Sequence, residues 1–381
     1  MDLIRAIDIR TIFILLPLTA VLLGLVLWLG PRSNRREGLS RWIVGLALIA
    51  ISWLLMASRG YVAPALSVAL ADGLMMAGLL LQVGALYEFR HGKALTHYSL
   101  APGLLLFLFL LLVPLEFRAY SLIGSFLLSV PLLIMGIQSW NLGASAARFP
   151  MAIFYLLGGV LLQARALHIW FAPEADLHFF SSHPLHIVAF VNSFAMTISG
   201  SIGFLEMQRW RAEMSIRYYA MYDELTDLLN RRSFFDLAEG ERIKAQKSGV
   251  TLAVMMLDID NFKLINDRYG HFTGDHVLAS IARAARENLR GNDLLCRSGG
   301  EEFMALLVDV DIESAVEIAQ NIRGAVQALA MKGIDEPVTM SIGVAACDSL
   351  EVSGIELGLR RADAALYQAK NSGRNQVSVA Q

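Results

Sequence analysis

The chain has 381 residues, of which 55% are hydrophobic and only 17% charged, and its mean hydropathy is +0.51. These values exclude a wholly soluble globular protein, in which about a quarter of the residues are charged, and they also exclude intrinsic disorder. The formal net charge of −2 does not support a nucleic-acid binder that works through a basic surface. Two cysteines, Cys296 and Cys347, are too few for a disulfide framework and indicate a reducing compartment.

Nearly all of the excess apolarity lies before about residue 206, in stretches of membrane-spanning length. About 20 apolar residues cross a hydrocarbon core of ~30 Å as a helix. The first such stretch is followed by arginines rather than by a small-residue cleavage site, which argues against a cleaved signal peptide. Residues 1–206 are therefore predicted to form a transmembrane sensory region. About seven spans are expected, at residues 11–30, 42–58, 63–87, 97–115, 120–138, 150–171 and 185–205.

The distribution of charge between the spans predicts an orientation, because short cytoplasmic loops collect Lys and Arg. Alternate loops are rich in cations: Arg32, Arg35, Arg36 and Arg41 in residues 31–41, Arg90 and Lys93 in 88–96, and Arg148 in 139–149. The intervening loops carry only Arg59 and Arg118, and residues 172–184 carry Glu174 and Asp176 without a cation. This pattern places the N-terminus outside and everything from residue 206 onward in the cytoplasm.

Several polar residues of the apolar half have two interpretations. Asp72 and Arg165 lie within predicted spans, where ionisable groups are usually functional or paired, although Arg165 could instead extend to the interface. Four histidines cluster near the outer ends of the last two spans, and they are either ordinary loop residues or a metal or proton sensor. They are His168, His178, His183 and His186.

Residues 207–222 are predicted to form a signalling helix that links the two halves. Met207, Trp210, Met214 and Met221 have the spacing of a coiled-coil seam, with Arg217 at the missing position. Such a helix pairs with its copy in a second chain, and the alternative is a single amphipathic stalk on the membrane surface.

After residue 222, apolar runs of strand length alternate with helical patterns. Strands are expected at 251–258 and 338–347 and a hairpin at 293–308, with helices at 275–289, 311–330 and 353–370. The fold class is therefore a polytopic α-helical membrane region followed by an α/β domain at 223–381, with a mixed sheet flanked by helices.

Acidic residues lie at two predicted strand ends of this domain. Asp258 and Asp260 close a buried strand, and Glu301 and Glu302 lie in the hairpin turn behind two glycines. Glycines let backbone N–H groups approach a phosphate closely. Carboxylates beside a phosphate require a divalent cation, and Mg²⁺ prefers few carboxylates together with phosphate oxygens. Asp258 and Glu301 are the predicted metal ligands, and solvated turn acids are the alternative.

Five motifs in this half resemble the GGDEF-domain diguanylate cyclases, nucleotidyltransferases with a nucleotidyl-cyclase-like fold. GGEEF at 299–303 resembles the family signature, and the resemblance covers about residues 216–381. Ser298 departs from the pattern, because the family often has an aromatic residue there. The other motifs are DELTDLLNRRSF at 223–234, LDIDNFKLINDRYGHFTGD at 257–275, RGND at 290–293 and AKNSGRN at 369–375.

The resemblance implies a role for each matching residue. Asp258, Glu301 and the backbone carbonyl of Ile259 bind Mg²⁺ or Mn²⁺, and Glu301 or a metal-bound hydroxide takes the proton from the 3′-hydroxyl. Arg290 and Asp293 form an inhibitory product site. The GTP-binding residues are Phe262 and Lys263, whose N–H groups wrap the phosphates; Asn266 and Asp275 at the guanine edge; His271 beside the nucleotide; Gly299, Gly300 and Glu302 at the turn; and Lys370 and Arg374, one helical turn apart, at the triphosphate.

The resemblance further implies a membrane-bound enzyme of the bacterial inner membrane that condenses two GTP to cyclic di-GMP and two pyrophosphates. Each domain of a homodimer holds one GTP, and cyclic di-GMP is both product and inhibitor. The expected partners are thus GTP, cyclic di-GMP, a second copy of the chain and the lipid bilayer, with no nucleic acid. One alternative is a degenerate, non-catalytic nucleotide-binding receptor, and another is a transporter or receptor whose catalytic domain is an accessory.

Overall fold

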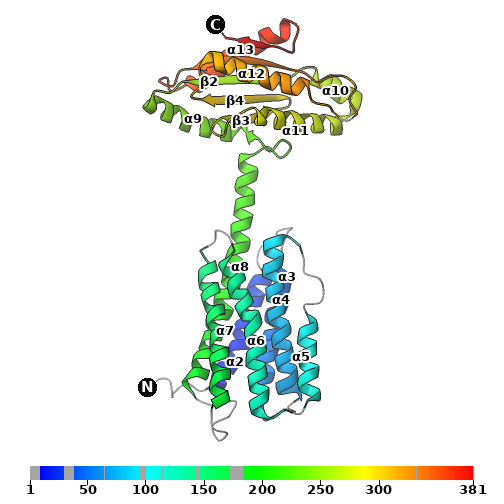
Figure 1. Ribbon diagram of the computed structural model, residues 1–381, viewed down its shortest axis with the longest axis vertical. Coiled ribbons are helices and arrows are strands. Elements are labelled where there is room, and N and C mark those ends of the chain that lie inside the picture. Colours follow the sequence, from blue (N-terminus) through cyan, green and yellow to red (C-terminus); the bar gives the residue numbers. More distant parts are fainter. Residues whose placement is uncertain are drawn as a thin grey trace. The chain divides into compact units, whose positions relative to one another are not determined.

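The computed structural model describes residues 9–29, 38–63, 65–93, 100–113, 115–142, 146–171, 183–331 and 333–380. The chain divides into two compact units, Met1–Ala212 and Glu213–Gln381. The first unit is helical, and the second is an α/β domain (Figure 1). Several loop residues used for the predicted orientation lie outside the described residues: Arg32, Arg35, Arg36, Glu174 and Asp176.

The first unit is built from long apolar helices. Six helices of the described part are long and apolar enough to cross a membrane, where seven spans were predicted. The predicted span at 97–115 corresponds to the twelve-residue helix α5, which is shorter than the roughly 20 residues that a span requires. The helices are α2 (Ile9–Leu29), α3 (Leu39–Ala57), the π-helical turn η1 (Ala65–Leu70), α4 (Ala71–His91), α5 (Ala101–Leu112), α6 (Phe117–Trp140), α7 (Arg148–Phe171) and α8 (Pro184–Met221).

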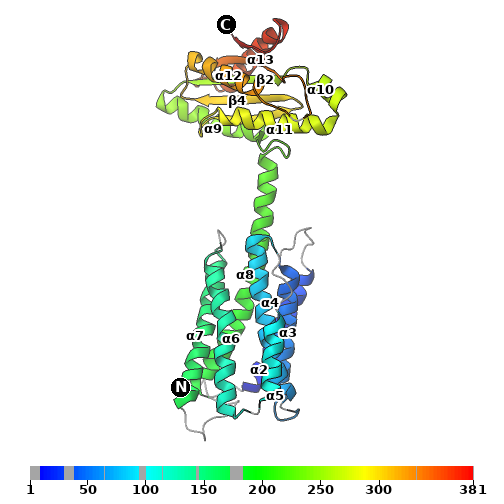
Figure 2. The same ribbon diagram turned by 45° about the vertical axis from the view of Figure 1, so that its right-hand side comes forward.

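Small residues bring neighbouring helices of this unit into close contact, as is usual where helices associate in lipid. Helix α3 lies beside α4, and α6 lies beside α7 (Figure 2). A Cβ atom added to Gly45 on α3 would lie only 2.7 Å from the carbonyl oxygen of Gly78 on α4. Trp42 and Phe204 stack with ring centroids 4.5 Å apart, which joins α3 to α8.

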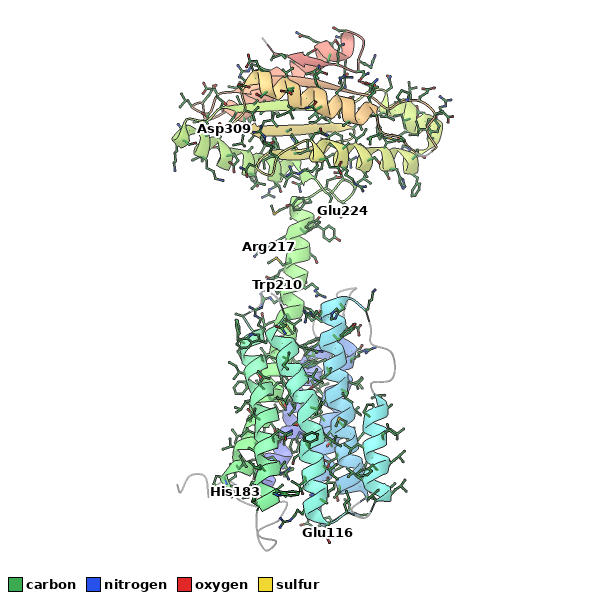
Figure 3. The ribbon with its side chains drawn as sticks, in the orientation of Figure 1. Glu116, His183, Trp210, Arg217, Glu224 and Asp309 are labelled. Carbon is green, nitrogen blue, oxygen red and sulfur yellow. The ribbon has the colours of Figure 1, made fainter. Side chains whose placement is uncertain are left out.

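Helix α8 is 38 residues long, and the boundary between the two units falls within it. It carries the residues of the predicted linker, including Trp210 and Arg217 (Figure 3). Met207, the first position of the proposed seam, is only 1% exposed because it packs into the core of the first unit. Met214 and Met221 are exposed on the helix surface. Met207 is therefore not accessible to a second chain, whereas Met214 and Met221 are.

The second unit confirms the expected mixed sheet flanked by helices. The strand order is β1-β3-β4-β2-β5-β6, with antiparallel pairs at the centre and parallel pairs at both edges. The strands are β1 (Leu229–Asn230), β2 (Leu252–Ile259), β3 (Leu294–Gly299), β4 (Glu302–Val308), β5 (Met340–Cys347) and β6 (Val377–Val379). The helices are α9 (Arg231–Ser248), α10 (Phe262–Tyr269), α11 (His271–Glu287), α12 (Ile312–Gln327) and α13 (Gly354–Asn371).

Strand β2 lies at the centre of this domain, and all eight of its residues are buried. Its side chains alternate between two cores, because successive residues of a strand point to opposite faces. Met255 and Leu257 pack with α11 and α12, whereas Val254 and Met256 pack with α9 and α13. The sequence shows a continuous apolar run here because neither face is exposed to water.

The close approach of α13 to β5 generates a stability prediction for the isolated 213–381 fragment. A Cβ atom on Gly343 of β5 would overlap the backbone of α13 at Ala362 and Leu366, and backbone atoms cannot move aside easily. We expect Gly343→Ala to lower the free energy of unfolding by about 3 kcal/mol. Gly324→Ala on α12 is the matched control, because its Cβ meets open space and Ala favours a helix by about 0.5–1 kcal/mol. Urea unfolding measures both, and equal stabilities would contradict this packing.

Candidate active site

Asp258 is the last residue but one of the buried strand β2, and its side chain is buried in the domain. The residue is 4% exposed and lies opposite Glu302 of β4 and Ser341 of β5 in the sheet register. By strand alternation it shares the face of Met256, which α13 covers. Near the end of α13, the ammonium group of Lys370 lies 2.7 Å from Asp258 Oδ2. The carboxylate is thus paired with a cation, as buried charges usually are.

The hairpin between β3 and β4 brings two further acids to the same place. Gly299 and Gly300 have φ angles of 152° and 54°, which side chains disfavour and glycine accepts. Next in the chain, the carbonyl oxygen of Glu301 accepts a hydrogen bond of 3.4 Å from the backbone N–H of Ile259. This bond ties the turn to the end of β2, so Glu301 and Glu302 lie next to the buried aspartate.

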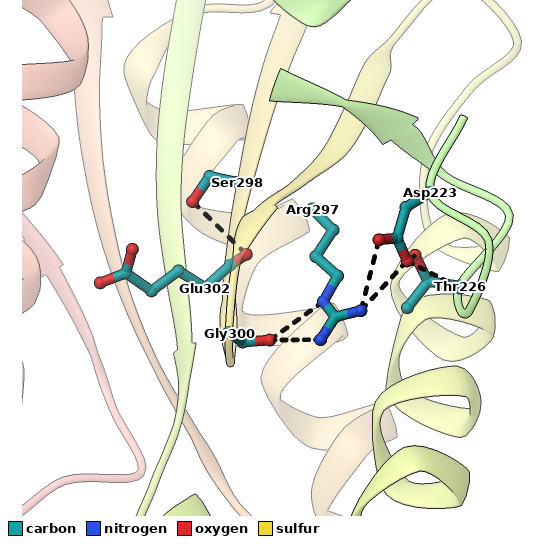
Figure 4. A network of polar contacts seen from close by, with 6 residues as sticks. All are labelled: Asp223, Thr226, Arg297, Ser298, Gly300 and Glu302. Atoms are coloured by element: carbon teal, nitrogen blue, oxygen red, sulfur yellow. Dashed lines mark hydrogen bonds and ion pairs between the residues drawn. The ribbon is translucent and has the colours of Figure 1, made fainter. Parts of the chain in front are cut away.

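An ion pair that sequence reasoning missed holds this turn in place. The guanidinium of Arg297 donates to the carbonyl oxygen of Gly300 at 2.8 and 3.0 Å and lies 3.2 Å from Asp223 Oδ1 (Figure 4). Asp223 also accepts hydrogen bonds from the backbone N–H and the hydroxyl of Thr226. The DELT segment is therefore bonded to the hairpin turn. The only signal for Asp223 in the sequence was its place in the DELTDLLNRRSF motif, and its partner lies 74 residues away.

The charges at the strand end favour the binding of a cation. Burial raises the pKa of Asp258 above its usual range, the ammonium of Lys370 opposes this increase, and the charges of Glu301 and Glu302 add to it. Three carboxylates thus lie near one another, and one ammonium group pairs with Asp258. Among the described residues, no three His, Cys, Asp or Glu side chains are grouped to hold a metal ion by themselves. Two carboxylates and a backbone carbonyl fit Mg²⁺ if substrate oxygens complete its shell.

Asp260, two residues further along, has a structural role. It is 5% exposed, and its carboxylate accepts hydrogen bonds from the hydroxyls of Thr339 and Ser341, at 2.8 and 2.7 Å. It accepts a third from the backbone N–H of Asn375, at 3.0 Å. These bonds join the end of β2 to β5 and to the segment after α13. The two strand-end aspartates therefore differ, because only Asp258 faces the acidic turn.

Helix α10 begins directly after this strand end. Asn261 has a left-handed φ of 54°, which turns the chain sharply, and Phe262 is buried in the core while Lys263 is exposed. The first N–H groups of an α-helix have no partner within the helix and favour an anion. The backbone N–H groups of Phe262 and Lys263 are therefore suited to an anion.

The predicted guanine-contacting residues come from two adjacent helices. Asn266 on α10 packs against Gly274 on α11, since a Cβ atom at Gly274 would overlap the Asn266 side-chain oxygen. Asp275 follows Gly274 in the chain and is exposed, and His271 is exposed at the start of α11. This contact brings Asn266 near Asp275, as a shared base-binding role requires.

The two predicted triphosphate-binding cations are arranged differently from the expectation. Lys370 lies in the last turn of α13, but the helix ends at Asn371, before Arg374 is reached. Arg374 has a left-handed φ of 62°, and its backbone N–H donates to the carbonyl oxygen of Ala369 at 3.1 Å. The two residues are therefore not separated by one helical turn, and Arg374 lies on the loop that follows.

Comparison with known proteins places this domain in a family. Residues 220–376 match the family described as "Diguanylate cyclase, GGDEF domain". The chain carries a GGDEF domain. It is homologous there to curated cyclases such as diguanylate cyclase DgcM of Escherichia coli, with 39% identity over 170 residues that cover 45% of this chain and 41% of the relative.

Two further comparisons concern the same GGDEF domain. Diguanylate cyclase DgcP of Pseudomonas aeruginosa is 39% identical over 166 residues, covering 43% of this chain and 24% of the relative. The chain thus spans less than half the length of these curated relatives. Among solved structures, the chain is similar to a crystal structure of the coiled coil and GGDEF domain of DgcB from Caulobacter crescentus in complex with c-di-GMP. The sequence identity is 32% and the TM-score is 0.43. The match covers 46% of this chain and 94% of the DgcB chain.

The RGND segment of the GGDEF domain is a turn held by its own aspartate. Asp293 is 2% exposed, and its carboxylate accepts hydrogen bonds from the backbone N–H groups of Arg290, at 2.8 Å, and Val308, at 3.1 Å. Arg290 is exposed. Within this predicted inhibitory site, Arg290 is the accessible group and Asp293 holds the turn that presents it.

The predicted histidine cluster of the first unit comes together in part. His168 near the end of α7 stacks on His183, which precedes α8, with ring centroids 4.1 Å apart. His186 lies 5.8 Å from His183 by the same measure. These three rings are not grouped to hold a metal ion, and His178 lies outside the described residues.

The two strand-end aspartates of the GGDEF domain generate the second prediction. Asp260→Ala leaves three donors without their acceptor, so we expect it to lower the free energy of unfolding of the 213–381 fragment by about 2–4 kcal/mol. The control is Asp267→Ala at an exposed position on α10, which should change stability by less than about 0.5 kcal/mol. Chemical denaturation measures both. An Asp260→Ala protein as stable as the parent would contradict the structural role.

Proposed function

We propose that the chain is a membrane-bound diguanylate cyclase that condenses two GTP to cyclic di-GMP and two pyrophosphates. The observation that carries this proposal is the pairing of the buried Asp258 with Lys370 beside the Gly299-Gly300 turn, at 2.7 Å. A carboxylate at 4% exposure next to further acids is a suitable site for a divalent cation that accompanies a phosphate. The homology of residues 220–376 to diguanylate cyclases supports the same activity.

In this proposal the metal is held by the carboxylates of Asp258 and Glu301 and by the carbonyl oxygen of Ile259. Bound Mg²⁺, or Mn²⁺ in its place, would neutralise negative charge on the phosphoryl oxygens. Lys370 opposes the rise that burial causes in the pKa of Asp258, and in this proposal it also adds a positive charge beside the triphosphate. Glu301 lies at the turn, tied to the end of β2 by its backbone carbonyl, and in this proposal its carboxylate accepts the proton of the attacking 3′-hydroxyl.

The remaining residues bind and orient GTP. The start of α10 supplies the N–H groups of Phe262 and Lys263 to the phosphates, and Arg374 supplies a second cation. Asn266 and Asp275 select guanine, because a carboxylate can accept from its N1–H and its amino group whereas adenine lacks those donors. A donor missing at such a site can reduce efficiency by on the order of 10⁴-fold.

One domain holds one GTP and cannot join two, so two GGDEF domains must meet with their sites facing each other. Each 3′-hydroxyl then attacks the α-phosphate of the other nucleotide in line, and pyrophosphate leaves. Dimerisation is thus part of catalysis in this proposal. The first unit and α8 are the part of the chain that can regulate how the two domains meet.

The proposed topology follows from the charge pattern and from the apolar helices. The predicted seven spans would put the N-terminus outside the inner membrane of a bacterial cell and the GGDEF domain in the cytoplasm, and six of the described helices are long enough to span it. Arg41 and Glu88, on the side assigned to the cytoplasm, form an ion pair of 3.0 Å between α3 and α4. With an even number of spans, the N-terminus would lie in the cytoplasm, and the GGDEF domain would remain there.

The third prediction tests the activity directly. Residues 207–381 incubated with GTP and Mg²⁺ should form cyclic di-GMP, identified by mass spectrometry. Glu301→Ala should reduce the initial rate by on the order of 10²–10⁴-fold, because it removes a metal ligand and the proton acceptor. The domain should stay folded, since Glu301 lies in a turn outside the core. Glu313→Ala, at an exposed position on α12, is the control and should keep full activity.

Two results of this experiment would contradict the proposal. Substantial cyclic di-GMP from a pure, folded Glu301→Ala protein would remove Glu301 from the catalytic role. GTP binding without product from the unchanged fragment would instead favour the degenerate receptor, which only binds nucleotide.

The fourth prediction concerns inhibition by the product. The exposed guanidinium of Arg290 can bind a guanine or phosphate edge through two hydrogen bonds. Arg290→Ala should therefore weaken inhibition by cyclic di-GMP roughly 10- to 100-fold and raise the product plateau, with little change in the initial rate. Arg283→Ala on α11 is a control with the same charge change at an exposed position. Equal plateaus in all three proteins would mean that RGND is only a structural turn.

The fifth prediction tests whether α8 transmits a signal between the units. Seven residues inserted after Met214 keep the phase of the helix surface, whereas two residues rotate it by roughly 200°. We expect the seven-residue insertion to preserve the activity of the full chain in lipid and the two-residue insertion to lock it high or low, because packed helices have discrete arrangements. Cyclic di-GMP formation measures both. If the insertions behave alike, α8 is a passive tether.

A further inference from the structure

The first unit contains a cavity whose wall is formed by residues of α3, α4, α6, α7 and α8. Its volume is about 130 Å³, close to the ~150 Å³ of an engineered apolar cavity that holds benzene. Most of the wall is apolar, with Trp53, Leu79, Phe190 and Met196 among the lining residues. A cavity of this kind accepts a molecule whose apolar body is about as large as one benzene ring.

The two oppositely charged residues of the wall balance each other. Among the described residues that line the cavity, Asp72 on α4 is the one carboxylate and Arg165 on α7 is the one guanidinium, and they attract each other electrostatically. The hydroxyl of Tyr120 donates to Asp72, and Arg165 donates to the hydroxyl of Ser125 at 3.1 Å. An ion taken into this apolar surrounding would therefore lack a counter-charge, so the wall favours an uncharged molecule.

Asn192 on α8 supplies the observation that points to a ligand. Its side chain lines the cavity and is 6% exposed. Its amide nitrogen donates to the carbonyl oxygen of Phe154 on α7 at 3.2 Å. Because a carbonyl oxygen accepts and cannot donate, this bond determines which end of the amide is nitrogen and which is oxygen.

The side-chain oxygen of Asn192 is buried and has no hydrogen-bond partner among the described residues. Two hydroxyl groups on the same helix line the cavity as well, but each donates to its own backbone: Ser193 to the carbonyl of Ala189, and Thr197 to the carbonyl of Ser193. Buried polar atoms are rarely left unsatisfied, and each costs free energy unless something binds to it. The group that this oxygen lacks is a hydrogen-bond donor.

We propose that this cavity binds a small uncharged alcohol or phenol, whose ring-sized apolar body lies against the wall and whose hydroxyl donates to the side-chain oxygen of Asn192. The balanced pair of Asp72 and Arg165 accounts for the absence of charge, the unsatisfied acceptor for the donor, and the volume for the size. The site lies wholly within the first unit. Its test is a binding measurement, so it does not depend on the cyclase activity proposed above.

The test uses the full chain in detergent micelles and radiolabelled phenol as the probe, near neutral pH, where a phenolic hydroxyl keeps its proton. Saturable binding above that of empty micelles is expected. Unlabelled phenol should displace the label roughly 3- to 10-fold better than benzene, which lacks the hydroxyl, or benzaldehyde, whose oxygen can only accept. Benzoate and benzylammonium carry a charge and should displace it much less well than phenol does.

Asn192→Leu tests the acceptor, because leucine has a similar size and no oxygen. This variant should bind phenol roughly 3- to 10-fold more weakly and should bind radiolabelled benzene as the parent does, so the preference for the hydroxyl is lost. Retained benzene binding also shows that the variant is folded. The matched control is Gln138→Leu on α6, which removes another buried amide oxygen that lacks a partner among the described residues but does not line the cavity. Its phenol binding should equal that of the parent.

A second substitution tests whether the probe occupies this cavity. Ser193→Leu enlarges a side chain of the wall, so it should weaken the binding of phenol and benzene alike. Ser199→Leu is the matched control, because it makes the same change on α8 at a position that does not line the cavity. It should bind both probes as the parent does.

Any of five results would overturn the proposal. The first is no saturable phenol binding by the unsubstituted chain, which would leave water as the donor to Asn192. The second is displacement by benzene or benzaldehyde as good as by phenol, which would mean that no donor is recognised. The third is displacement by benzoate or benzylammonium as good as by phenol, which would indicate an ion site. The fourth is equal phenol binding in the Asn192→Leu and Gln138→Leu proteins, and the fifth is equal binding in the Ser193→Leu and Ser199→Leu proteins.

Discussion

A carboxylate buried at the end of a central strand requires a cation beside it, and this requirement organises the active-site end of the GGDEF domain. Asp258 is carried inward because every residue of β2 is buried. Its partner Lys370 must come from α13, the helix that covers that face of the sheet. The acids of the hairpin turn then add negative charge, which a single ammonium cannot balance. In the proposed cyclase, a divalent cation would balance this charge beside the phosphates.

Hydrogen bonds and an ion pair fix the backbone around Asp258 and the hairpin turn. The guanidinium of Arg297 joins the glycine turn to Asp223, and Asp260 joins the end of β2 to β5 and to the loop after α13. None of these three residues has to contact a nucleotide to be important. They restrict the positions of the groups that would, and a phosphoryl-transfer site depends on such restriction more than on covalent chemistry.

In the helical unit, by contrast, the polar groups are few and lie among apolar side chains. Each of them therefore needs a hydrogen-bond or ion-pair partner within the unit. Most have one: Ser52 binds the carbonyl of Ala71, and Tyr120 binds Asp72. Among the described residues, the side-chain oxygen of Asn192 has no such partner. Helix α8 carries Asn192 and also continues to Met221, so one helix belongs to the cavity wall and to the linker.

The sequence by itself determined the two-part organisation, the mixed sheet and the GGDEF-family motifs. These follow from local patterns: uncharged runs of about 20 residues, an eight-residue apolar strand, and glycines beside acids. Short elements such as β1 and β6 were missed, because two or three residues carry no periodicity. The helix predicted at 275–289 begins instead at His271, since the glycine before it serves as the N-cap.

Only the tertiary structure decided how these parts interact. It separated Asp258 from Asp260, placed Asp293 inside its own turn, ended α13 before Arg374, and buried Met207 in the core of the first unit. It also assembled Asp72, Arg165 and Asn192, which are far apart in the chain, around one cavity. Sequence patterns report the period of an element and the residue types that it carries. Which distant side chain satisfies a given charge depends on packing in three dimensions, and no local pattern records it.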